Sequence, residues 1–66
     1  MITDSEARLG AFEDALAAMR TDLRQAEETL ADLRAQNKCK TATYQQLFSQ
    51  KLMLQRALGY FDARGL

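Results

Sequence analysis

The stretch that decides the fold is QNKCKTAT, residues 36–43. It carries no apolar periodicity, whereas the sequence on both sides of it does. Asn37 readily takes the left-handed conformation found at the end of many helices. The lysines that follow it suit the negative end of a helix dipole, and Thr41 suits the start of a new helix. We therefore predict a turn at about residues 37–40.

Upstream of this stretch, apolar residues recur in alternating steps of three and four. They are Leu9, Phe12, Leu16, Met19, Leu23, Ala26, Leu30 and Leu33. This is the heptad repeat of a helix that packs along one stripe, as in a coiled coil. Thr3 followed by Glu6 fits a capping box, in which two side chains satisfy the first backbone amides of a helix. The pattern predicts a helix from about Thr3 to about Gln36.

Downstream of the stretch, a second apolar series begins. Its members are Tyr44, Leu47, Phe48, Leu52, Leu54, Leu58 and Phe61. They cover about half the circumference of a helix, which predicts a helix from about Thr41 to about Asp62. Lys51 falls near the middle of this arc. Its stem can pack while its ammonium group reaches water, or it can be a buried charge that fixes register or pairs with a partner.

Two architectures fit these helices, because the heptad phase continues through the turn. A single helix of about 60 residues would be about 90 Å long and would need another chain along its length. Asn37 would then occupy a core position, which is a register device of dimeric coiled coils. Charge favours a hairpin instead. Residues 1–36 carry a net charge of −4 and residues 37–66 carry +4, and folding one half onto the other pairs these fields. We therefore predict an all-α fold, a coiled-coil-like antiparallel two-helix hairpin that forms one domain over residues 1–66.

The two helices of such a hairpin meet along an inner stripe, the seam. We assign to the seam Leu9, Leu16, Leu23, Leu30, Tyr44, Leu47, Leu54, Leu58 and Phe61. Four further large residues of the second helix cannot all face the first helix, and we predict that they bind a partner: Phe48, Leu52, Met53 and Tyr60. The first helix has a second strip, made of Ala7, Ala11, Ala15 and Ala18. These residues are either scattered surface positions or a contiguous patch. Because so small a core rarely stabilises a chain alone, we expect a partner or a dimer to stabilise the hairpin.

Composition excludes several classes of function. The chain has no Pro, three Gly and one Cys, which argues against barrels, sandwiches and disulfide scaffolds. It has no His, and Cys39 lacks a base or a second thiol, so we expect no catalytic residue, no metal site and no cofactor. The balanced net charge disfavours nucleic acid as a partner. No apolar run approaches the roughly 20 residues that span a bilayer, and the acidic start is unlike a signal peptide. We expect a cytoplasmic protein without membrane insertion.

Several short segments are similar to one known family. Near the start, Glu6-Ala7-Arg8-Leu9 is similar to the opening of its members. The second helix is closer, with Tyr44-Gln45, then Leu54, Leu58-Gly59 and the apolar pair Tyr60-Phe61 at the family's spacing. In these residues, in length and in the expected hairpin, the chain resembles the YscE/PscE-type co-chaperones of the type III secretion needle subunit.

The resemblance implies a small cytoplasmic α-hairpin that has no enzymatic activity. Members of that family bind a second chaperone, which is built of tetratricopeptide-like helical repeats. The second chaperone holds the C-terminal helix of the needle subunit in its groove and keeps the subunit monomeric before export, in a system that serves virulence. The residues alone leave an alternative, a homodimeric four-helix bundle that acts as a scaffolding or adaptor protein.

Overall fold

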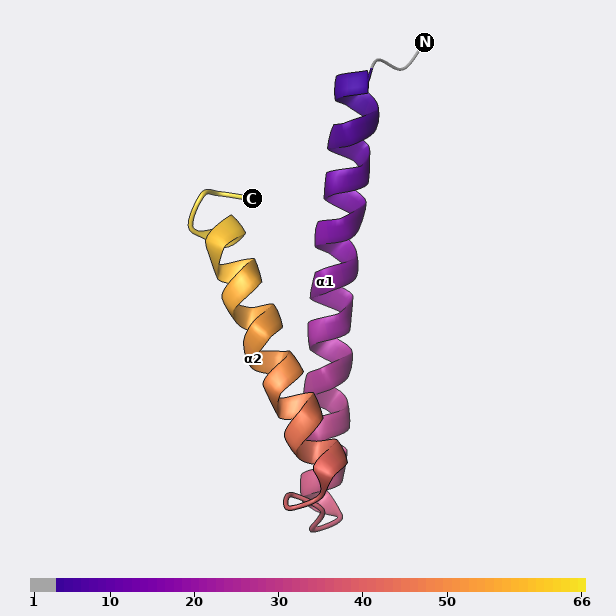
Figure 1. Cartoon of the computed structure of the whole chain (residues 1–66), viewed down its shortest axis with the longest axis vertical. Coiled ribbons are helices and arrows are strands. Elements are labelled where there is room, and N and C mark those ends of the chain that lie inside the picture. Colours follow the sequence, from indigo (N-terminus) through magenta and orange to yellow (C-terminus); the bar gives the residue numbers. More distant parts are fainter. Residues whose placement is uncertain (1–3) are drawn as a thin grey trace.

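The computed structural model describes residues 4–66 and consists of two helices joined by a short turn (Figure 1). Helix α1 spans Asp4–Ala35 and helix α2 spans Ala42–Asp62. The helices run antiparallel and pack against each other. No strand occurs in residues 4–66. The all-α hairpin expected from the sequence is confirmed.

The first helix ends in a Schellman motif. Asn37 has a φ of 58°, in the left-handed region. Its N–H donates to the carbonyl of Arg34 at 3.1 Å, and the N–H of Lys38 donates to the carbonyl of Leu33 at 2.8 Å. These two hydrogen bonds satisfy carbonyls that lack a partner inside the helix. The chain leaves the helical path here, so the single long helix is excluded.

The second helix begins with a side-chain cap at Thr41. Its hydroxyl accepts a hydrogen bond from the N–H of Tyr44 at 3.2 Å and donates one to the carbonyl of Lys38 at 2.9 Å. The hydroxyl therefore ties the start of α2 to the turn. The expected start of the first helix at Thr3, with its capping box, lies outside the described residues.

The core is a single line of contacts between the two helices. Its buried residues are Ala26, Leu30, Leu54 and Leu58. Five other residues assigned to the seam are half-buried around them: Leu16, Leu23, Tyr44, Leu47 and Phe61. Each fully buried leucine contributes about 1.5–3 kcal/mol to stability. Three buried leucines and one buried alanine therefore leave the hairpin only marginally stable.

The assignment of Leu9 to the seam needs a correction. Leu9 is 58% exposed, because α1 has 32 residues and α2 only 21, so the first turns of α1 extend past the end of α2. Figure 1 shows this overhang beyond the C-terminus. Near the end of α2, the helices meet through Phe12 and Phe61, whose ring centroids lie 5.3 Å apart in an edge-on arrangement.

The hairpin is a flat rod. Its principal extents are 53 × 23 × 16 Å, and its radius of gyration is 15.5 Å, against about 11 Å for a compact domain of this length. The two helices lie side by side as a single layer, with no second layer of the described chain above or below them. Each helix therefore covers the other along one edge only, and both broad faces of the pair are open to solvent.

Candidate binding surface

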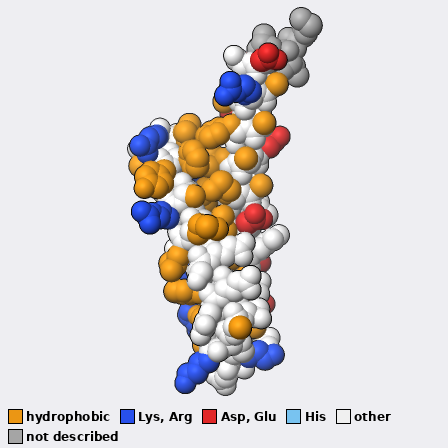
Figure 2. All heavy atoms as spheres, viewed as in Figure 1, with side chains coloured by type: hydrophobic (Ala, Val, Ile, Leu, Met, Phe, Trp, Pro, Cys, Tyr) orange, Lys and Arg blue, Asp and Glu red, His pale blue; other side chains and the backbone are white. Residues whose placement is uncertain are grey.

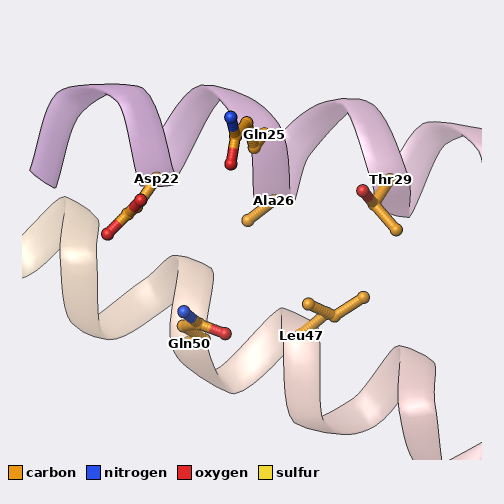
Figure 3. Close-up of a pocket in the computed structure, with 6 residues that line it drawn as sticks. All are labelled: Asp22, Gln25, Ala26, Thr29, Leu47 and Gln50. Atoms are coloured by element: carbon orange, nitrogen blue, oxygen red, sulfur yellow. The ribbon is translucent and has the colours of Figure 1, made fainter. Parts of the chain in front are cut away.

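A groove between the helices marks one of the two broad faces, which we call the front face. The groove has a volume of about 280 Å³ and is lined by Asp22, Gln25, Ala26, Thr29, Leu47 and Gln50. Asp22 and Ala26 point from α1 toward α2, and Leu47 points from α2 into the space between the helices (Figure 3). Because most of the lining side chains are polar, this half of the face, nearer the turn, is suited to water.

The front face becomes apolar toward the open end of the hairpin. Residues seven positions apart lie about two turns apart on nearly the same side of a helix. On α1, the groove residues Asp22 and Gln25 are therefore followed toward the open end by the alanines at positions 15 and 18, and then by Ala11. On α2, Ala57 follows Gln50 in the same way. Figure 2 shows hydrophobic side chains gathered over the half of the molecule away from the turn.

Two large side chains stand on the α2 side of this apolar half. Met53 is 65% exposed and Tyr60 is 57% exposed. They belong to the front face because each is three positions beyond a front-face residue, Met53 beyond Gln50 and Tyr60 beyond Ala57. A step of four from the same residues leads instead to the seam residues Leu54 and Phe61. We call this set the front patch: Ala11, Ala15, Ala18, Met53, Ala57 and Tyr60.

Tyr60 lies between two arginines. Arg56 precedes it by four residues and Arg64 follows it by four, so both lie on the same side of α2 as Tyr60. A shallow pocket of about 430 Å³ is lined by these three residues with Gly59 and Ala63. The guanidinium of Arg64 donates to the backbone carbonyl of Tyr60 at 2.7 Å, which holds its charge near this turn of α2. The edge of the front patch formed by α2 is therefore basic.

The opposite broad face, the back face, carries polar bonds between the helices. Arg34 donates to the hydroxyl of Tyr44 at 3.1 Å, and this hydrogen bond raises the pKa of the guanidinium above its ordinary value. Near the open end, Arg20 forms an ion pair with Asp62 at 2.6 Å and also donates to the carbonyl of Leu66 at 3.1 Å. Both partners of the ion pair are about half exposed, so we expect a contribution of at most about 1 kcal/mol.

Phe48 and Leu52 lie on the back face and form a second apolar patch, the back patch. The ring of Phe48 stacks on that of Tyr44 with centroids 6.2 Å apart and planes at 17°. The ammonium group of Lys51 lies 5.7 Å from the centre of the Phe48 ring. Lys51 is thus half-buried with its charge against an aromatic face, and its stem packs while the charge stays outside the core.

All four residues predicted to bind a partner are exposed, by 38% for Phe48, 51% for Leu52, 65% for Met53 and 57% for Tyr60. They do not form one stripe, because two lie on the front face and two on the back face. The sequence reading did not include Ala57, Arg56 or Arg64 in the surface. The spacing of three and four residues from Tyr60 was the signal that could have found them.

Within residues 4–66, no three His, Cys, Asp or Glu side chains gather into a potential metal site. Cys39 is an exposed free thiol in the turn. Over the same range, neither helix is long and apolar enough to cross a membrane.

Comparison with protein-family models, with curated proteins and with solved structures finds no match for this chain. The functional proposal therefore depends on the exposed apolar patches, on the charges beside them and on the resemblance described above.

Proposed function

We propose that this chain is a cytoplasmic co-chaperone of a type III secretion system. It binds and stabilises a tetratricopeptide-like needle chaperone and thereby helps to keep the needle subunit monomeric before export. One observation carries the proposal: large apolar side chains are exposed on both broad faces of a hairpin in which only four of the described residues are buried. Such exposure is typical of a surface that a protein partner covers.

The mechanism needs contact and no chemistry. The terminal repeats of a helical repeat protein expose an apolar face to solvent unless another structural element covers it. A rigid hairpin with spare apolar side chains can serve as such a cover. A needle subunit assembles through head-to-tail contacts that do not close, so it polymerises unless its helix is held. Holding that helix in the groove of the stabilised repeat chaperone prevents assembly.

The front and back patches make the proposal testable side by side. We expect Tyr60→Ala on the front face and Phe48→Asp on the back face each to weaken the complex with the repeat chaperone about 30-fold or more, as loss of a central aromatic anchor does. Ala17→Asp is the matched control, because Ala17 is exposed on the side of α1 that faces away from α2. Circular dichroism of each variant verifies that the hairpin remains helical.

The experiment is co-expression of this chain with a needle chaperone and its subunit, followed by pull-down. With the two aromatic variants we expect the repeat chaperone to become insoluble and the subunit to polymerise or be degraded. Normal binding by both variants would move the interface to the alanine strip of α1. Failure of the unaltered chain to bind any needle chaperone, with a stable homodimer instead, would favour the scaffolding alternative.

A further inference from the structure

The hairpin exposes more surface than its mass requires. Its accessible surface is 5342 Å², whereas a compact monomer of 7.5 kDa exposes about 4,200 Å². The excess is roughly 1,100 Å². A stable interface of standard size covers about 800 Å² on each partner. One additional contact on one broad face would therefore bring the chain to ordinary compactness.

The front patch is complementary to itself in size. Its α1 side consists of alanines, whereas its α2 side carries the large side chains of Met53 and Tyr60. The contact between Phe12 and Phe61 fixes the register of the helices, so Ala15 and Tyr60 lie at about the same height along the hairpin. A surface with small residues on one side and large residues on the other fits a copy of itself turned by half a turn.

We propose that the front face binds a second copy of this chain, through a two-fold axis that runs parallel to the helices. This rotation keeps heights unchanged and exchanges the two sides of the face. It places α1 of each copy over α2 of the other, so Tyr60 of one copy packs on Ala15 of the second copy. The result is a four-helix bundle in which the large side chains of each copy pack against the alanines of the other.

Charge selects this axis over the other two-fold arrangement. An axis across the helices would place α1 over α1, and the segment that contains α1 carries a net charge of −4 in residues 1–36. The parallel axis instead places α1 over α2, whose segment, residues 37–66, carries +4. It also brings Asp14, at the outer edge of α1, to the edge of the second copy that carries Arg56 and Arg64.

This inference stands apart from the proposed function, because it concerns the free chain. It is tested without any chaperone, by analytical ultracentrifugation and by light scattering after gel filtration. We expect a dimer at micromolar concentration. Ala15→Arg places bulk and positive charge under Tyr60 and the two arginines, and we expect it to raise the dimer dissociation constant about 30-fold or more. Ala17→Arg, the same change on the outer side of α1, should leave the constant unchanged.

Cross-linking between differently labelled chains tests the orientation. In a Cys39→Ser background, one chain carries Ala15→Cys and the other carries Tyr60→Cys. A disulfide between the two chains requires α1 of one copy to lie on α2 of the other. We expect this mixture to form heterodimers on mild oxidation, and a mixture of Ala17→Cys with Tyr60→Cys to form few.

Two results would overturn the proposal. The first is a free chain that sediments as a monomer at tens of micromolar. The second is a dimer that both arginine variants leave intact and in which the two cysteine mixtures cross-link equally, since its interface would then lie elsewhere. Because circular dichroism distinguishes an unfolded variant from a folded monomer, loss of the dimer by Ala15→Arg counts in favour only if the helical signal is retained.

Discussion

The rings of Phe12 and Phe61 meet edge-on, with centroids 5.3 Å apart and planes at 69°. The two residues are far apart in the sequence, and their contact lies near the open end of the hairpin, opposite the turn. At the turn the covalent chain holds the two helices in register, whereas at the open end this aromatic contact does so. The heights of all residues on the front and back faces follow from this register.

The first prediction concerns the energy of that aromatic pair. In a double-mutant cycle with Phe12→Leu and Phe61→Leu, we expect a coupling of about 0.5–1.5 kcal/mol, because edge-to-face rings attract beyond their buried area. Urea unfolding of the four variants at one chain concentration measures it. A parallel cycle with Phe12→Leu and Phe48→Leu should be additive within about 0.5 kcal/mol, because Phe48 stacks on Tyr44 near the turn and not on Phe61. Equal coupling in the two cycles would contradict the register.

The second prediction concerns the buried leucines. Leu54→Ala or Leu58→Ala should reduce the free energy of unfolding by about 2–5 kcal/mol, through lost transfer energy and the cavity left behind. That is enough to unfold so small a core. Leu52→Ala is a matched control, because it removes the same atoms from a half-exposed site in the same helix and should cost less than about 1 kcal/mol. Similar losses at positions 52, 54 and 58, measured by urea unfolding, would mean that the core lies elsewhere.

Most of the fold could be predicted from the sequence, because it depends on the spacing of apolar residues and on the residues of the turn. The heptad steps identify the buried stripe of each helix, and Asn37 supplies the left-handed residue that ends the first helix. The position of Leu9 was the error. A stripe on one helix is buried only where a second helix covers it, and the difference in helix length already implied the overhang. The heptad pattern of one helix does not indicate how far the other helix extends along it.

The candidate surface was less accessible. The sequence placed Met53 and Tyr60 outside the seam together with Phe48 and Leu52, and all four are exposed. It did not separate them into two faces. The list of seam residues does not say which flank of α2 lies beside which flank of α1, so it does not define a front and a back face. The hydrogen bond from Arg34 to Tyr44 and the groove between Asp22 and Gln50 provide that information. Both depend on how residues of the two helices are placed relative to each other, which the pattern along one helix does not specify.

The third prediction concerns the turn. Asn37→Ala should lower the free energy of unfolding by about 1 kcal/mol, because alanine resists the left-handed φ of 58° that the Schellman motif requires. Asn37→Gly should be as stable as the unaltered chain or more stable, since glycine adopts this conformation without a steric cost. Thermal unfolding followed by circular dichroism measures both. If alanine and glycine at this position gave the same stability, backbone conformation would not be what ends the helix.

The last prediction joins stability to assembly. Only four residues of the described chain are buried, so the isolated hairpin should gain much of its stability from covering the front patch. Mass action then makes the melting temperature depend on concentration. Each tenfold increase in chain concentration adds about 1.4 kcal/mol per dimer, which corresponds to a rise of about 5 °C for two chains of this length. Calorimetry or circular dichroism over a hundredfold range of concentration measures the effect, and Ala15→Arg should abolish it while also lowering the melting temperature. A monomer that melts above about 80 °C at every concentration would show instead that the line of contacts around Leu30, Leu54 and Leu58 is sufficient by itself.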